Sequence, residues 1–126
     1  YKKQKHKIHL ASLRKINKKN IISLDKLIKR INKKINFIKI DVDGFEFEVL
    51  QSGLFYINKY KPIIHIEFVP YLHQEFGYSS KMLINLIRIK LKYNFYNENL
   101  KKITDIDKYI LSIKKRSENF FLIPSN

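Results

Sequence analysis

The chain has 126 residues, of which 44% are hydrophobic, and it carries a formal net charge of +15. This length and composition allow one domain, or part of a larger one, with a buried core, and argue against a mostly disordered chain. The absence of cysteine excludes disulfide frameworks and thiolate zinc sites. No apolar run approaches the roughly 18 residues that a membrane span needs, and no signal segment opens the chain. These features predict a soluble, cytoplasmic protein.

The positive charge raises nucleic acid or an anionic membrane as a partner, because basic patches release counterions from phosphate. The basic residues are 22 lysines and only four arginines, and Lys, Ile and Asn together make 54 of the 126 residues. That bias is typical of AT-rich codons, whereas nucleic-acid recognition favours arginine. A composition effect therefore explains the charge better than polyanion binding, which stays open as an alternative function.

The first 20 residues contain eight Lys or Arg and no acid. This pattern predicts a basic connecting segment over residues 1–19 and a domain over residues 20–126. Residues 20–23 could form the end of a short strand. SLDKLIKRI then predicts a helix, with Ser23 as its N-cap and Asp25 next to the positive end of the helix dipole.

Two apolar runs predict strands that are each followed by a helix. INFIKIDV, residues 35–42, has the length of a strand, and its near-continuous apolarity favours a parallel strand covered on both faces. FEFEVLQS then predicts a short amphipathic helix with Gly53 as its C-cap. The second strand is PIIHIEFV, residues 62–69.

The rest of the chain predicts one long helix and two further strands. Either Ser79 or Ser80 could cap the helix, whose apolar stripe consists of Met82, Leu83, Leu86, Ile87 and Leu91. YNFY, residues 93–96, is the third strand, a polar region covers residues 97–118, and NFFLIP, residues 119–124, is the last strand. This order predicts an α/β fold with a mostly parallel sheet that ends in a hairpin-like pair.

Carboxylates gather where the first two of these strands end. Asp41 and Asp43 follow the first strand, and Glu67 lies at the end of the second. Ligands of open α/β sheets bind outside the carboxyl ends of the strands, and adjacent strands lie about 4.8 Å apart. We therefore expect the three carboxylates to converge if the two strands pair. Asp41 could also simply cap the following helix.

Other polar residues near these strands have simpler interpretations. Glu46 and Glu48 are two positions apart on a short helix and cannot share a face, so we expect Glu48 to face solvent. Glu67 lies within an apolar strand, where a carboxylate seldom stays buried without a partner. His65, on the same strand face, is expected to be a packed, hydrogen-bonded core histidine rather than a catalytic base.

The sequence predicts no metal site. The four histidines are scattered and form no HExxH pattern. A calcium-binding EF-hand loop aligned on Gly44 would need an acid at residue 39 and a glutamate at residue 50, but these are Lys39 and Leu50. A nuclease core with a Glu-x-Lys strand would need a lysine at residue 69, which is Val69.

The stretch FIKIDVDGFEFEVL, followed by KYKPIIHIEF, resembles the FkbM family of methyltransferases. The usual pattern of that family is close to IKIDVEGxExxVL, with KPxxxxE downstream. SLDKLI is similar to the T-L-D-x-hydrophobic segment of the family, and FFLIP is similar to its closing strand. The resemblance covers roughly residues 20–126 in several spaced motifs, which makes it more specific than any single motif. One departure is Asp43, where the family usually has glutamate.

The resemblance implies a class I, Rossmann-like methyltransferase fold, whose sheet ends in an antiparallel strand. It also implies S-adenosylmethionine as the methyl donor and a hydroxyl of a sugar, glycolipid or secondary metabolite as the acceptor. By position, Asp41 is then the general base or a group that orients substrate or cofactor. Asp43, Glu46 and Glu67 are expected to support the site.

A glycine-rich strand-loop-helix, which binds most of the cofactor in class I methyltransferases, cannot be found in this sequence. The chain has only three glycines, Gly44, Gly53 and Gly77. The chain therefore resembles the C-terminal half of such an enzyme, and alone it is expected to bind cofactor poorly. An inactive, truncated copy of a methyltransferase is the remaining alternative.

Overall fold

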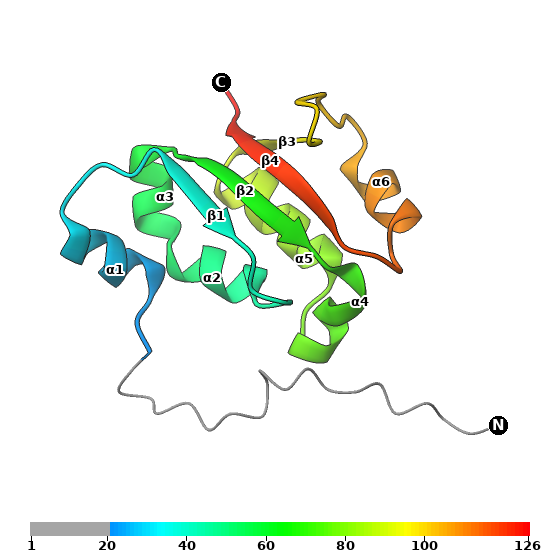
Figure 1. The fold of residues 1–126 in the computed structure, drawn as a ribbon, viewed down its shortest axis with the longest axis horizontal. Helices are drawn as coiled ribbons and strands as arrows, with labels where there is room; N and C mark the ends of the chain where they lie inside the picture. Colours follow the sequence, from blue (N-terminus) through cyan, green and yellow to red (C-terminus); the bar gives the residue numbers. More distant parts are fainter. Residues whose placement is uncertain (1–20) are drawn as a thin grey trace.

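The computed structural model describes residues 21–126, which form a mixed α/β fold around one open sheet (Figure 1). The strands are β1 (Phe37–Ile40), β2 (Ile63–Phe68), β3 (Tyr93–Tyr96) and β4 (Glu118–Pro124). The helices are α1 (Leu24–Ile31), α2 (Glu46–Ser52), α3 (Leu54–Tyr60), α4 (Pro70–His73), α5 (Ser80–Asn85) and α6 (Ile106–Ser112). A 3-10 turn at Gln74–Phe76 follows α4, and a π-helical segment at Leu86–Lys90 extends α5. The predicted connecting segment 1–19 lies outside the described residues.

The strands are arranged in the order β1-β2-β4-β3. β1 and β2 are parallel, with Phe37 opposite Ile63 and Ile40 opposite Ile66. β4 is antiparallel to both of its neighbours, so β1, β2 and β3 run in one direction. The predicted α/β class, the parallel first pair and the antiparallel last strand are therefore confirmed.

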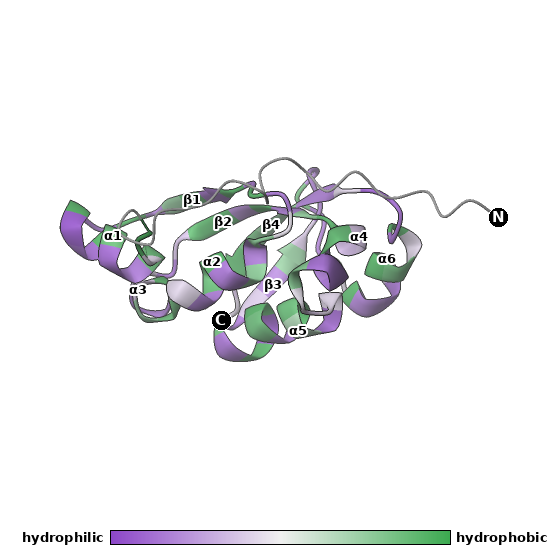
Figure 2. Ribbon diagram, turned by 90° about the horizontal axis from the view of Figure 1, so that it is seen from below, coloured by the Kyte–Doolittle hydropathy of each residue, from purple (hydrophilic) through white to green (hydrophobic). Residues whose placement is uncertain are grey.

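Apolar side chains on one face of the sheet form the core, because alternate residues of a strand point to the same face. Figure 2 shows α2, α3 and α5 on that side of the sheet. The fully buried strand residues include Ile64, Ile66, Phe68, Phe120 and Leu122, and the aromatic rings of Phe68 and Phe120 meet edge to face at 5.8 Å. On the other face, Ile63 is exposed, and His65 and Glu67 are half-buried.

The helix ends follow the capping residues in the sequence. The Ser23 side chain accepts a hydrogen bond from the Lys26 amide, and Ser79 accepts one from the Met82 amide, as expected for N-caps. Gly53 is the C-cap of α2, as predicted. Asp25 has a second role: its carboxylate accepts hydrogen bonds from the backbone amides of Phe55 and Tyr56 and so joins α1 to the start of α3.

Several expectations were wrong in detail. β1 is shorter than the predicted strand and is not covered on both faces among the described residues, since 54% of Phe37 is exposed. No strand is assigned to residues 21–23, and Asn20 lies outside the described part of the chain. Met82 is exposed rather than part of the buried stripe. The polar region 97–118 contains a helix, α6, which buries Ile106 and Ile110.

Candidate active site

The turn between β1 and α2 carries the first two carboxylates. Asp41 comes directly after the last residue of β1, and Asp43 has a left-handed backbone with φ of 50°. Gly44 follows with φ of 103°, a conformation that side chains rarely allow. A Cβ atom at this position would lie 2.4 Å from the Phe76 ring. Only glycine therefore lets this turn pack against the segment that follows β2.

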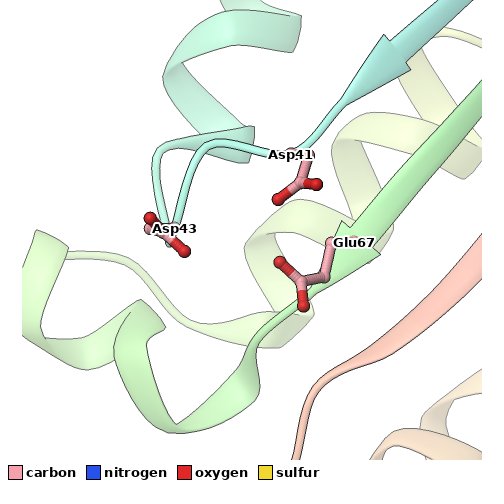
Figure 3. A group of neighbouring side chains, drawn as sticks. All are labelled: Asp41, Asp43 and Glu67. Atoms are coloured by element: carbon pink, nitrogen blue, oxygen red, sulfur yellow. The ribbon is translucent and has the colours of Figure 1, made fainter.

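Asp41, Asp43 and Glu67 come together at the carboxyl ends of β1 and β2, and we call these three residues the acidic rim (Figure 3). One carboxylate oxygen from each residue lies within 4.8 Å of the others. The parallel pairing of β1 and β2 brings Asp41 and Glu67 to the same edge of the sheet. The expected convergence of the three carboxylates is confirmed.

The acidic rim is accessible from solvent. Asp41 and Asp43 are exposed, and Glu67 is half-buried. Lys39 lies 3.3 Å from Asp41, in an ion pair whose side chains are both more than half exposed. Carboxylates in such a position can accept a proton or hydrogen bonds from a hydroxyl, or they can coordinate a hard cation through their oxygen atoms. Exposed acidic residues also cluster where no metal ion binds, so this geometry alone does not identify a metal site.

Glu46 does not lie in the acidic rim. Its side chain is fully buried under the turn, at the first residue of α2. One carboxylate oxygen accepts a hydrogen bond from the Gly44 amide at 3.0 Å, and the other lies 3.4 Å from the Tyr78 hydroxyl oxygen. The Tyr78 hydroxyl also lies 2.6 Å from the Gly44 carbonyl oxygen. Glu48 is exposed, as predicted.

Burial is the main cause of the pKa shifts of Glu46 and Tyr78. The loss of solvation raises the pKa of Glu46 above its ordinary value, although the amides of Gly44 and Glu46 and the Tyr78 hydroxyl partly offset that rise. The negative charge of Glu67 raises the same pKa further. Burial also raises the pKa of Tyr78, so its hydroxyl stays protonated and able to donate.

His73, at the end of α4, is a second fully buried polar residue. Its Nδ1 atom lies 2.8 Å from the Ser80 hydroxyl, and its Nε2 atom has no hydrogen-bond partner among residues 21–126. That Nε2 atom is 4.0 Å from a Glu46 carboxylate oxygen. Burial lowers the pKa of His73 to about 4, so the ring is neutral near pH 7 and the two groups form no ion pair there.

Replacing His73 by asparagine tests this account through the pH dependence of stability. The folded pKa of His73 is about 4, against an ordinary value of 6.5, so the unfolded chain takes up a proton first as the pH falls. Stability that is present above pH 6.5 is therefore lost between 6.5 and about 4. The raised pKa of Glu46 acts in the opposite sense, since its contribution is lost as the pH rises above 4.5. The His73→Asn variant lacks the histidine contribution. Between pH 7.5 and pH 4.5 its free energy of unfolding should therefore fall by roughly 2 kcal/mol less than that of the unchanged chain.

The measurement is urea unfolding at a series of pH values. Asparagine is chosen because its amide can still reach the Ser80 hydroxyl. His65→Asn serves as the control, since His65 lies at the sheet surface, 2.7 Å from Glu98 and against the Phe121 ring. Parallel stability curves for the unchanged chain and His73→Asn would contradict a neutral, buried His73.

The predicted interpretation of His65 is confirmed in part. It is hydrogen-bonded to Glu98 and packed against an aromatic ring, as expected, but it is half-buried on the open face of the sheet rather than in the core. Within residues 21–126, no helix combines the length and apolarity that crossing a membrane requires.

An open α/β sheet with acidic side chains at the ends of two adjacent parallel strands is an arrangement typical of ligand-binding enzymes. The family model described as "Methyltransferase FkbM domain" matches residues 2–116 of the chain. The chain therefore belongs to the FkbM methyltransferase family, and the predicted resemblance is confirmed. Searches of curated proteins and of solved structures returned no match to the chain.

Proposed function

We propose that this chain is part of an S-adenosylmethionine-dependent O-methyltransferase, which transfers a methyl group to a hydroxyl of a sugar, glycolipid or secondary-metabolite acceptor. The observation that carries the proposal is the acidic rim, which a member of a methyltransferase family presents at the ends of β1 and β2. The acceptor class follows from the family resemblance.

The sheet supports a Rossmann-like arrangement for the complete enzyme. β4 lies between β2 and β3 and is antiparallel to both, which agrees with the antiparallel last strand implied by the resemblance. On this proposal the residues from 20 onward are the C-terminal part of the methyltransferase domain. β1 and β2 would then be the fourth and fifth strands of the complete sheet.

The acidic rim is complementary in charge to the methyl donor, because S-adenosylmethionine carries a positive sulfonium centre and an amino group. That donor supplies an electrophilic methyl group when it is bound. The chain supplies the groups around the acceptor: transfer needs the acceptor oxygen held in line with the methyl carbon. A carboxylate within hydrogen-bond reach can take the hydroxyl proton as the oxygen becomes the nucleophile.

Asp41 is the proposed general base or orienting group. It is exposed at the end of β1 and has a weak surface partner, Lys39. Asp43 and Glu67 would support it by orienting the acceptor through hydrogen bonds. Glu46 cannot touch the acceptor from its buried position, so its supporting role would be exerted through the backbone of the turn.

Cofactor binding tests the proposed division of the site. The three glycines Gly44, Gly53 and Gly77 form no glycine-rich phosphate- or nucleotide-binding loop, so most of the cofactor contacts would come from a segment other than these 126 residues. We expect isothermal titration of this chain with S-adenosylhomocysteine to give a Kd weaker than about 1 mM. A version extended by upstream sequence that carries a glycine-rich strand-loop-helix should bind at micromolar concentration and transfer labelled methyl groups.

Each result has a separate meaning. Micromolar binding by the 126-residue chain would overturn the proposed division of the site while leaving methyl transfer possible. An extended protein that binds the cofactor but transfers no label to any hydroxyl acceptor in a sugar, glycolipid and metabolite panel would favour an inactive copy. Adenosine serves as the control ligand, because it lacks the homocysteine part of S-adenosylhomocysteine, whose α-amino group the acidic rim would attract.

A further inference from the structure

Two side chains hydrogen-bond to the turn Asp41–Gly44, and both bind to the backbone of Gly44. The Gly44 amide donates to Glu46 at 3.0 Å, and the Gly44 carbonyl accepts from Tyr78 at 2.6 Å. Both partners are buried, and Gly44 itself has no room for a side chain. The amide and the carbonyl of Gly44 are therefore both held by side chains, one from α2 and one from the loop before α5.

Those side chains are fixed in turn by aromatic packing. The Tyr78 ring stacks on Phe47 at 5.1 Å and on His73 at 4.8 Å. His73 is hydrogen-bonded to Ser80 in the first turn of α5 and packs edge-on against Phe68 at the end of β2. The contacts connect the turn after β1 with the end of β2, which are the two segments that carry the acidic rim.

A left-handed aspartate next to a glycine with φ of 103° is a costly backbone conformation. Such strain persists only where the surroundings over-determine it. Here the two hydrogen bonds at Gly44 supply that constraint. Because Asp43 is the residue before Gly44, the same hydrogen bonds also fix the direction of the Asp43 carboxylate. Burial of a carboxylate is also costly, so Glu46 would be poorly placed if it served packing alone.

We propose that Glu46, Tyr78 and His73 are positioning residues that hold the turn Asp41–Gly44 in one conformation and thereby set the distance between the Asp43 and Glu67 carboxylates. The functional part of this inference rests on the proposed methyl transfer, because only there does the geometry of the rim affect a rate. The structural part stands on its own and can be measured in the 126-residue chain.

The test compares two tyrosine-to-phenylalanine variants that each lose one buried hydroxyl. Tyr78→Phe removes the hydrogen bond to the Gly44 carbonyl. Tyr93→Phe removes a bond of the same kind, 2.7 Å long and also buried, to the Pro62 carbonyl. Because Tyr93 lies in β3 and its hydroxyl does not contact the turn, this control reproduces the loss of stability without the loss of positioning.

The first readout is nuclear magnetic resonance of the 126-residue chain, in which only three glycine amides need to be distinguished. In Tyr78→Phe, hydrogen exchange at the Gly44 amide should become about tenfold faster relative to global unfolding. The carboxyl carbon chemical shifts of Asp43 and Glu67 should also change, because the distance between the two carboxylates changes. Tyr93→Phe should change neither quantity.

The second readout is methyl transfer by the extended protein. Tyr78→Phe should lower kcat about tenfold with little change in the KM for S-adenosylmethionine, while Tyr93→Phe should retain the original kcat. If Tyr78→Phe leaves the hydrogen exchange and the carboxyl chemical shifts unchanged, the positioning role is overturned, whatever the activity. If these change but the unchanged extended protein transfers no methyl group, the proposed function fails and the positioning of the turn stands.

Discussion

Replacing Asp41 by asparagine is expected to lower kcat/KM for methyl transfer by about 100-fold or more in the extended protein. The physical reason is that the amide cannot accept the proton of the acceptor hydroxyl, although its size and hydrogen-bonding reach are nearly those of the acid. If Asp41 is the general base, the loss falls on kcat. If Asp41 only orients the acceptor, the loss falls mainly on the acceptor KM.

The fold should tolerate this substitution. The Asp41 side chain is 51% exposed, and its partner Lys39 is 61% exposed, so their ion pair contributes at most about 1 kcal/mol. Glu48→Gln is the matched control, because Glu48 is an exposed acid in the same segment that lies outside the acidic rim. Full activity of Asp41→Asn, with unchanged circular dichroism and urea unfolding, would remove Asp41 from the mechanism.

Replacing Gly44 by alanine is expected to reduce the free energy of unfolding by about 3 kcal/mol. Two causes act together. The backbone has φ of 103°, where a Cβ atom is strained, and the new methyl group would lie 2.4 Å and 2.6 Å from two carbons of the Phe76 ring. Phe76 is itself packed against Phe45 at 4.2 Å, so the ring cannot move away without losing other contacts.

Gly77→Ala separates these two causes. Gly77 also has a positive φ, 81°, but apart from its chain neighbours no atom of the described part of the chain lies within 4 Å of the position that its Cβ would take. Alanine there should cost only about 1 kcal/mol, from the backbone conformation alone. Urea unfolding of the two variants measures the difference. Equal losses would show that Phe76 and the turn adjust freely and that the close packing at Gly44 is unimportant.

A double variant, Gly44→Ala with Phe76→Leu, gives an independent check of the same contact. The smaller, flexible side chain should make room for the methyl group, so the combined loss should be less than the sum of the two single losses. Strict additivity would contradict a steric cause.

The sequence by itself determined the strands, several helix ends and the acidic rim. The runs at β1 and β2 are apolar and short. Ser23, Gly53 and Ser79 cap helices that lie next to them in the sequence, so their effect is local. Pairing of parallel strands places both carboxyl ends at one edge, so the meeting of the rim carboxylates could be deduced before the structure.

The helix α6 was within reach of the sequence but was missed. Ile106, Ile110 and Ile113 have helical spacing and are buried, and the Asp105 side chain accepts from the Lys108 amide as an N-cap. The many polar residues around them obscured this signal.

The tertiary structure alone decided the roles of Glu46, His73 and Tyr78. The Tyr78 hydroxyl reaches Gly44 across 34 residues, and His73 reaches Glu46 across 27. Nothing in the local pattern of either segment specifies the other, because burial of a polar side chain depends on which distant groups satisfy it. The sequence therefore placed the acids that face solvent and named Glu46 as a supporting residue, while its burial and its contacts with Gly44 and Tyr78 were decided only when the chain had folded around it.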